Sequence, residues 1–127
     1  MAPNVLLLLV EDETLIRMNL AEDLVDAGFE LAVAADGQKA LAELEADPSR
    51  FCAVITDIRL GRGPDGWDVA RRARDAVPDM PVLYISGDSA HEWAAKGVPS
   101  SAMVAKPFYP AEVVTALSAL LSPEKGA

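Results

Sequence analysis

Four charged side chains follow three separate apolar runs of this 127-residue chain. Glu11 and Asp12 follow N-V-L-L-L-L-V, Asp57 follows F-C-A-V-I-T, and Lys106 follows S-A-M-V-A. If these runs are parallel strands of one sheet, their carboxyl ends lie at one edge and bring the four charges together. An edge of this kind would be a cation site beside a reactive carboxylate, and we expect the function of the protein to lie there.

The crowding of the three acids limits what this edge can be. Two carboxylates about 5 Å apart repel by roughly 3 kcal/mol at an effective dielectric constant near 20. Since the net stability of a domain is roughly 5–15 kcal/mol, such a cluster has to bind protons or a cation, or pair with a base. Oxygen ligands without nearby His or Cys favour Mg²⁺ over zinc. Taken one at a time, these acids would be ordinary loop residues or helix caps.

The elements that would position these charges are five short apolar runs that alternate with helical segments. The predicted strands are residues 5–10, 31–35, 51–56, 82–85 and 102–105. Strands that alternate with helices imply a parallel sheet with helices on both faces. The sequence therefore predicts an α/β fold, a doubly wound, flavodoxin-like sheet with strand order 2-1-3-4-5. Ligands of such sheets bind between the first and third strands, which here end in the acids.

The helical segments carry recognisable start and stop signals. Apolar residues at helical spacing follow the first strand, and Gly28 is placed to end that helix. Asp36 and Asp65 are predicted to cap the second and third helices, and Pro110 is predicted in the first turn of the last one. A short fourth helix is expected over residues 90–96. We expect one domain over residues 1–127, with a core of about residues 4–121 and no output domain.

Composition excludes several classes of function. The net charge of −9 argues against binding to nucleic acid or to an anionic membrane, since both need basic surfaces. No run is long enough to span a membrane, and the N-terminal run lacks the flanks of a signal peptide. The single cysteine suits a reducing cytoplasm, where we expect the protein to be located. Cys52 lies inside an apolar run and is predicted to be a small buried side chain.

Two further polar residues at strand ends have two interpretations each. Lys106 would supply a mobile positive charge opposite Asp57, or it is a surface lysine before a turn. Ser86 ends the fourth strand, where its hydroxyl would donate to an anion near Asp57 or would cap a helix. Pro107 follows the lysine, and about 5–6% of X–Pro bonds in proteins are cis, so both isomers are open here.

The segments L-V-E-D, V-I-T-D, Y-I-S-G and V-A-K-P-F occur in this order at four predicted strand ends. Together they resemble the receiver domain of bacterial response regulators, in its stand-alone form, over residues 4–121. The resemblance implies that Asp57 accepts a phosphoryl group from a histidine kinase or a histidine phosphotransfer protein. It also implies that Mg²⁺ is bound by Glu11, Asp12 and Asp57, with the main-chain carbonyl of Arg59 completing the metal shell.

The same resemblance assigns roles to the remaining site residues. Ser86 would hydrogen-bond the phosphoryl oxygens after a conformational switch, and Lys106 would pair with the phosphoryl charge. Transfer to a carboxylate gives an acyl phosphate, and slow self-dephosphorylation is implied rather than metabolic turnover. Without an output domain, the protein would act on a downstream protein target or pass its phosphoryl group along a relay.

Three features depart from the usual pattern of that family. Met103 replaces the aromatic residue whose movement often reports phosphorylation. The loop after Asp57, D-I-R-L-G-R-G-P-D-G, is one residue longer than usual and has Gly61 where a proline is common. Arg59 and Asp88 would pair across the site and slow hydrolysis, or they are two exposed, unpaired charges.

Other functions and partner surfaces stay open at this point. A pseudo-receiver would bind proteins without being phosphorylated, and a Mg²⁺-dependent phosphohydrolase would usually need an acid where Arg59 stands. Leu15, Met18 and Val25 lie opposite the apolar stripe of the first helix. Leu15 and Met18, beside the acids, would dock a kinase or a phosphotransfer protein, or all three are scattered exposed residues. Trp67 is expected to pack in the core.

Overall fold

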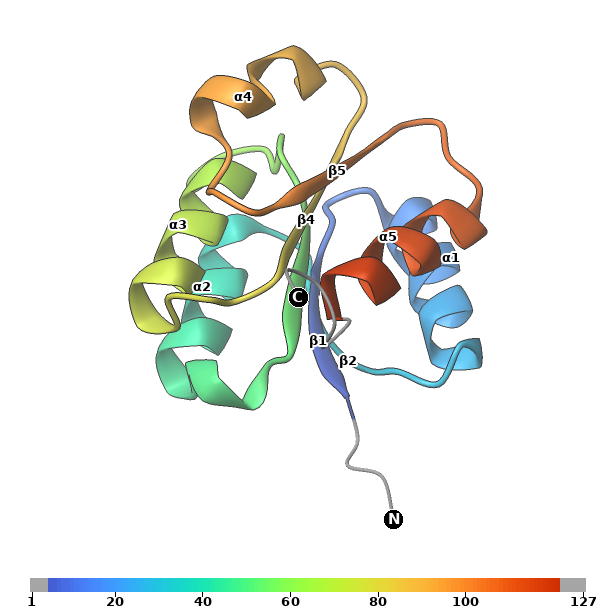
Figure 1. Ribbon diagram of the computed structural model, residues 1–127, viewed down its shortest axis with the longest axis horizontal. Coiled ribbons are helices and arrows are strands. Elements are labelled where there is room, and N and C mark those ends of the chain that lie inside the picture. Colours follow the sequence, from blue (N-terminus) through green and yellow to red (C-terminus); the bar gives the residue numbers. More distant parts are fainter. Residues whose placement is uncertain (1–4, 122–127) are drawn as a thin grey trace.

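Five strands form one parallel sheet in the order β2-β1-β3-β4-β5 (Figure 1). The computed structural model describes residues 5–121. The strands are β1 Leu6–Val10, β2 Glu30–Ala34, β3 Ala53–Asp57, β4 Val82–Ser86 and β5 Ala102–Ala105. Order and direction confirm the predicted doubly wound α/β fold, with strand ends within two residues of the predicted ones.

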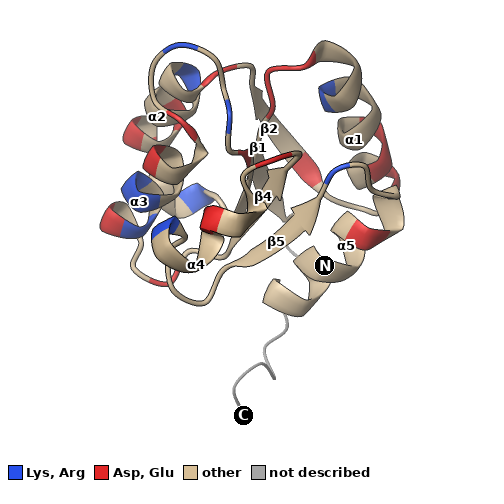
Figure 2. Cartoon of the chain, turned by 90° about the horizontal axis from the view of Figure 1, so that it is seen from above, with Lys and Arg blue, Asp and Glu red and all other residues tan. Residues whose placement is uncertain are grey.

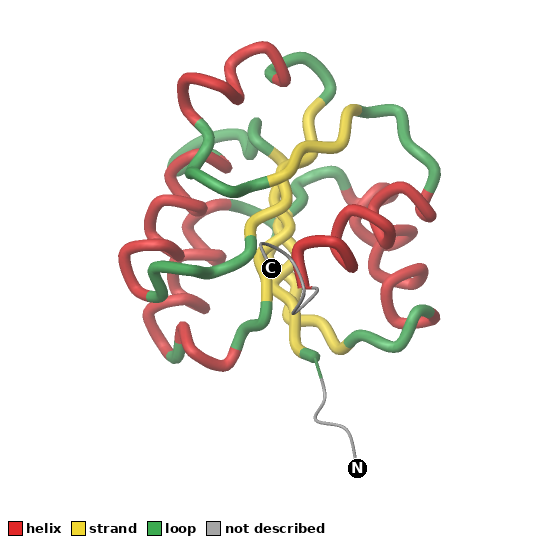
Figure 3. The backbone as a smooth tube through the Cα atoms, in the orientation of Figure 1, coloured by secondary structure: helices red, strands yellow, loops and turns green. Residues whose placement is uncertain are grey.

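Helices connect successive strands and cover both faces of the sheet (Figure 3). They are α1 Thr14–Asp26, α2 Gly37–Ala46, α3 Gly66–Ala76, α4 Trp93–Lys96 and α5 Pro110–Leu121, with short 3₁₀ turns at Pro48–Arg50 and Ala90–Glu92. The side chain of Asp36 accepts a hydrogen bond from the amide of Lys39 at 2.8 Å, as predicted for a cap. Asp65 caps α3, and Gly28, with φ +103°, follows the end of α1.

The core consists of two apolar clusters, one on each face of the sheet. Helices α1 and α5 cover one face, while α2 and α3 cover the other (Figure 1). Strands β3 and β4 are buried over their full length, because helices pack on both of their faces. Among the described residues, no helix is long and apolar enough to cross a membrane.

Cys52 corrects one prediction from the sequence. The cysteine is exposed rather than buried, and β3 begins only at the next residue. Its amide still donates a hydrogen bond to the carbonyl of Leu6 at 2.8 Å, at the amino-terminal end of the sheet. The continuous apolar run predicted that Cys52 belongs to the strand, but its side chain lies just outside the layer that the helices cover.

The two tryptophans differ in their surroundings. Trp67 in α3 is 4% exposed, as predicted for packing, and its ring centroid lies 4.9 Å from that of Tyr84. Trp93 in α4 is 36% exposed, and its indole nitrogen donates to the hydroxyl of Ser101 at 2.9 Å. Helix α4 is a single turn and buries none of its residues.

Candidate functional site

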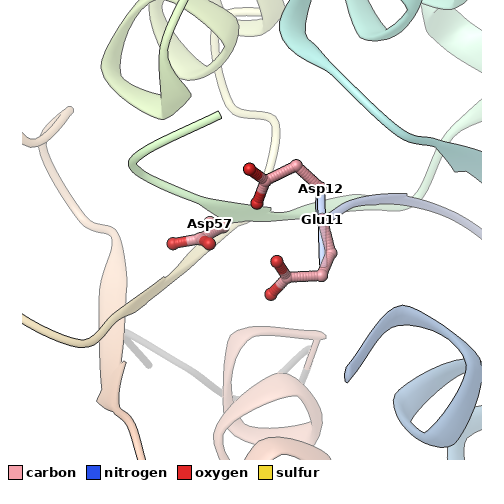
Figure 4. Close-up of side chains that lie close together, drawn as sticks. All are labelled: Glu11, Asp12 and Asp57. Atoms are coloured by element: carbon pink, nitrogen blue, oxygen red, sulfur yellow. The ribbon is translucent and has the colours of Figure 1, made fainter. Parts of the chain in front are cut away.

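Three carboxylates meet at the carboxyl edge of the sheet. The parallel register pairs Val10 of β1 with Thr56 of β3, so the residues that follow them lie side by side. One oxygen from each of Glu11, Asp12 and Asp57 lies within 4.8 Å of the others. Figure 4 shows the three side chains around one shared space, with Glu11 and Asp12 on different sides of the end of β1. The predicted meeting of these acids is confirmed.

The backbone around Asp57 is held from two sides. Its side-chain oxygen Oδ1 accepts a hydrogen bond from the amide of Ile58 at 2.7 Å, and the residue is 6% exposed. Helix α3 starts directly against it, since a Cβ atom on Gly66 would lie 2.2 Å from the carbonyl oxygen of Asp57. The amide of Gly66 also donates to the carbonyl of Ile58 at 2.8 Å. These contacts orient the carboxylate before any ligand binds.

Lys106 places its ammonium group among the acids. The Nζ atom lies 3.0 Å from Oδ2 of Asp57, 3.0 Å from Oε1 of Glu11 and 3.5 Å from Oε1 of Glu13. Burial of this side chain would lower its pKa, but the contacts with Asp57 and Glu11 outweigh burial and raise it. The lysine is therefore a charged part of the site and not a surface residue. The peptide bond that follows it, between Lys106 and Pro107, is cis.

Glu11 is the most buried acid of the cluster, with no exposed surface. Burial raises the pKa of Glu11 to about 7, and the charge of Asp57 adds to the rise, while the Glu13 amide and Lys106 act against it. Oε2 accepts a hydrogen bond from the amide of Glu13 at 3.1 Å. Oε1 is the one buried side-chain oxygen or nitrogen in residues 5–121 without a hydrogen bond of good geometry, although Lys106 is at ion-pair distance.

The acid cluster fits a small divalent cation. Mg²⁺ binds oxygens at about 2.0–2.1 Å, so two ligands on opposite sides of the ion are about 4.2 Å apart. The separation within 4.8 Å of the three carboxylates is close to this value. The acceptor atom Oε1 of Glu11 lacks a hydrogen bond, and Asp12 is exposed toward solvent, where a hydrated ion would enter. The residues present therefore fit the predicted metal.

A hollow of about 260 Å³ opens beside these charges. Its wall consists of Asp12, Glu13, Asp57, Arg59, Gly87, Asp88 and Lys106. Figure 2 shows how acidic and basic segments alternate around this end of the sheet, while α5 is mostly uncharged. The Nε atom of Arg59 lies 3.0 Å from Oδ1 of Asp88. Arg59 and Asp88 therefore form a pair and are not two unpaired charges. The predicted role of the Arg59 main-chain carbonyl in metal binding stays a prediction.

Ser86 is buried, and its hydroxyl points into the following turn. Its Oγ atom accepts a hydrogen bond from the amide of Ser89 at 2.6 Å. This hydrogen bond lies within the turn after β4 and caps neither the 3₁₀ turn Ala90–Glu92 nor α4, whose capping residues are Ser89 and Glu92. The contact of Ser86 with phosphoryl oxygens stays a prediction. Met103 is half-buried against the core cluster on the α2 and α3 face.

Two residues of the site were missed in the sequence. Glu13 is the third acid in E-D-E after β1, and its position in that run was the available signal. Ser89 is 2% exposed and links Ser86 to Arg59 and Asp88. Nothing in the segment S-G-D-S distinguishes it from an ordinary loop serine.

Helix α1 has exposed apolar residues on one face, and other residues of the same helix line a groove. Leu15 is 74% exposed, and Met18 and Val25 are exposed as well, as predicted for the face opposite the core stripe. A hollow of about 490 Å³ lies between α1 and the segment that joins β5 to α5. It is lined mainly by Ile16, Leu20, Pro107, Phe108 and Pro110, and it reaches Lys106.

Comparison with known proteins gives one consistent result. Residues 7–118 match the family model described as the response regulator receiver domain. A response regulator receiver protein from Anaeromyxobacter sp. (strain Fw109-5) is 35% identical over 111 residues, which are 87% of this chain and 43% of that protein. The response regulator MprA from Mycolicibacterium vanbaalenii is 33% identical over 127 residues, covering 95% of this chain and 53% of MprA. The chain thus spans about half the length, or less, of these curated relatives.

Solved structures agree with the sequence comparison. A response regulator receiver protein from Sinorhizobium medicae WSM419 superposes with a TM-score of 0.90 at 44% identity, over 93% of this chain and 94% of that one. The chemotaxis protein CheY4 from Vibrio cholerae gives a TM-score of 0.83 at 28% identity, over 94% of this chain and 100% of that one. Both neighbours share nearly the whole extent of the fold.

Proposed function

The chain belongs to the response regulator receiver domain family, and from this premise we propose that it accepts a phosphoryl group on Asp57 in a two-component signalling system. One observation carries the proposal. The buried carboxylate of Asp57 is oriented by the Ile58 amide and by the ammonium of Lys106, and it lies beside the carboxylates of Glu11 and Asp12. A nucleophile, a fixed positive charge and a cation site therefore stand together.

The transfer itself exchanges one bond to phosphorus for another. An oxygen of the Asp57 carboxylate forms the new P–O bond, while the P–N bond to the donor histidine breaks and its electron pair returns to the imidazole. Lys106 pairs with the negative charge on the phosphoryl oxygens as they arrive. Mg²⁺ held by Glu11, Asp12, Asp57 and the main-chain carbonyl of Arg59 would neutralise further phosphoryl charge. Slow attack by water on phosphorus would later return the carboxylate and release phosphate.

Labelling with a small phosphodonor tests this function. Wild-type protein incubated with Mg²⁺ and acetyl phosphate should gain one phosphoryl group by intact mass, and Asp57→Asn should gain none. Asp47→Asn is a matched control, because this acid lies in an exposed loop at the other end of the sheet. No mass change in the wild type would favour a pseudo-receiver. Fast, repeated consumption of the donor would favour a phosphohydrolase instead.

The metal is tested separately by thermal unfolding. Millimolar MgCl₂ should raise the melting temperature of the wild type at neutral pH, because a cation relieves repulsion among the three carboxylates. Asp12→Ala should lose most of this rise. An equal rise in both proteins would show that the ion acts elsewhere.

The proposed partners are a histidine kinase or a histidine phosphotransfer protein, and a downstream protein that reads the phosphorylated state. We place these partners in the cytoplasm, where the single thiol of the chain stays reduced. Phosphorylation would bias a two-state surface around α4 and β5. Exposed apolar side chains at the start of α1 would contact the kinase beside the acids.

Kinase docking is tested on α1. Leu15→Asp should slow phosphotransfer from a cognate kinase about tenfold while leaving acetyl phosphate labelling unchanged, since a charge in an apolar contact costs on the order of 1–3 kcal/mol. Val25→Asp is the matched control, because it is also exposed but lies at the far end of the same helix. An unaltered kinase rate in Leu15→Asp would refute this contact.

A further inference from the structure

Ser89 lies where two sets of contacts meet behind the site. Its amide donates to Oγ of Ser86 at 2.6 Å. Its hydroxyl donates to Oδ1 of Asp88 at 3.2 Å and accepts a hydrogen bond from Nε of Arg59 at 3.4 Å. The residue is 2% exposed, so its polar atoms depend on these partners. We call these three contacts the Ser89 latch.

The latch joins the loops that follow β3 and β4. Arg59 comes two residues after Asp57, whereas Ser86 ends β4. Through Ser89, the hydroxyl at the end of β4 is tied to a side chain that lines the hollow beside Asp57. The two side chains that contact the Ser89 hydroxyl, Arg59 and Asp88, also form an ion pair with each other at 3.0 Å. Together the contacts hold the turn after β4 in one position.

The position of Ser86 matters because its hydroxyl has two competing uses. In this structure Oγ accepts from the Ser89 amide, and it points into the turn rather than toward Asp57. Contact with a phosphoryl group on Asp57 requires the same oxygen to move toward β3. At 2.6 Å the existing hydrogen bond is short, and such a movement would lengthen or break it.

We propose that Ser89 is a positioning residue that holds Ser86 in its unphosphorylated orientation through its link to Arg59 and Asp88. The inference rests on the proposed phosphorylation of Asp57. Any contact present only in the unphosphorylated state shifts the equilibrium away from the reactive arrangement, so removing it favours that arrangement. The latch therefore slows phosphorylation of Asp57 until a donor supplies enough binding energy to break it.

Ser89→Ala tests the latch without changing the charge of the protein. The variant keeps the backbone amide but loses both hydroxyl contacts, and acetyl phosphate should label it about two- to fivefold faster than the wild type. This range is the rate ratio that corresponds to the small free energy of polar contacts made with exposed, charged side chains. Arg59→Ala should have a smaller effect in the Ser89→Ala background than in the wild type, because both changes remove the hydrogen bond between Arg59 and Ser89.

Ser101→Ala is the matched control. Its hydroxyl also holds the α4 region, donating to the Val98 carbonyl at 2.7 Å and accepting from the Trp93 indole at 2.9 Å, but it makes no contact with Ser86. If loosening of α4 alone speeds labelling, both serine variants will be faster, and the latch is overturned. A faster rate in Ser89→Ala only, with the melting temperature of both variants similar, supports it.

The amide proton of Ser89 gives a direct readout. In the wild type its NMR resonance should move upfield on phosphorylation, because the short hydrogen bond to Ser86 is lost. An unmoved resonance, or an unchanged labelling rate in Ser89→Ala, overturns the latch while the proposed function stands. A wild type that acetyl phosphate and Mg²⁺ never label overturns both.

Discussion

Helices α3 and α4 follow the two strands that end at Asp57 and Ser86, yet they are held in different ways. Helix α3 has eleven residues, begins with a capping box between Asp65 and Asp68, and buries five of its residues, from Gly66 to Ala73. Helix α4 has four residues, lacks a side-chain cap and buries none of them. Similar positions beside the site thus have different packing.

The difference separates two requirements of the site. The carboxylate of Asp57 has to stay oriented, and the well-packed start of α3 lies against its backbone. The turn after Ser86 has to move if the hydroxyl is to reach a phosphoryl group, and the short helix α4 that follows this turn buries none of its residues. Stability and switching are therefore assigned to two different segments, α3 after β3 and the turn with α4 after β4, which we call the two flanks of the site.

The largest test of this comparison uses the two tryptophans. Trp67→Ala should lower the free energy of unfolding by about 3–5 kcal/mol, because it removes a buried ring from the core. Trp93→Ala should lower it by less than about 1 kcal/mol, since the ring is partly exposed. Urea denaturation followed by circular dichroism measures both. Equal losses would break the distinction between the flanks.

A second test concerns the buried acid that follows β1, next to Asp57. The pKa of Glu11 is raised to about 7 in the folded protein from an ordinary value of 4.5. Between these two values the folded state binds more protons than the unfolded state, so this group lowers stability as the pH rises. The side chain in Glu11→Gln stays neutral at every pH. At pH 8 without divalent cations, the free energy of unfolding of this variant should therefore exceed that of the wild type by about 1–3 kcal/mol.

The pH dependence supplies the control for that test. At pH 4 the carboxyl of Glu11 is protonated in the folded protein, so the gain from Glu11→Gln should disappear. Thermal melts at both pH values, with and without MgCl₂, measure the difference. A gain that is equal at pH 4 and pH 8 would contradict the assignment to this carboxyl.

Capping gives a smaller effect on the same two helices. Asp65→Ala should cost about 1 kcal/mol, because the amide of Asp68 loses its side-chain acceptor at 2.9 Å, while the bond from the residue 65 amide to the Asp68 carboxylate stays possible. Glu92→Ala, before α4, should cost less than Asp65→Ala does, because it removes only an exposed pair with Lys96. Chemical denaturation that gave the reverse order would contradict the comparison.

The smallest expected effect concerns the pair that links the flanks. Arg59→Ala should cost less than about 1 kcal/mol of stability, because the pair with Asp88 is mostly exposed. If the pair also covers the phosphorylated residue, the lifetime of the phosphoryl group should fall about twofold. Equal lifetimes in wild type and variant would reject covering. Arg72→Ala, which breaks an exposed pair with Glu45 between α3 and α2, is the control.

Much of this arrangement was predictable, because it depends on local pattern. Continuous apolar runs marked the buried strands, and Asp36 and Asp65 marked helix starts by their own side-chain chemistry. The topology rules for parallel sheets then placed Asp57 beside Glu11 and Asp12 without further information.

The features that could not be predicted depend on contacts between distant segments. Lys106 has Glu11 as a partner besides Asp57, and that requires side-chain positions rather than strand order. The contacts of Ser89 depend on where the turn after β4 lies relative to Arg59, and the sequence does not give that position. The exposure of Cys52 depends on a one-residue strand boundary, which hydrophobicity alone does not resolve.

The exposed Cys52 has a practical consequence. It is the only cysteine of the sequence, and it lies five residues before Asp57, at the opposite end of β3. Five strand residues span about 16 Å, so a maleimide dye attached there would stand clear of the acids. The protein therefore carries a natural attachment point for fluorescence anisotropy or surface immobilisation, and binding to a kinase could be followed without engineering a thiol.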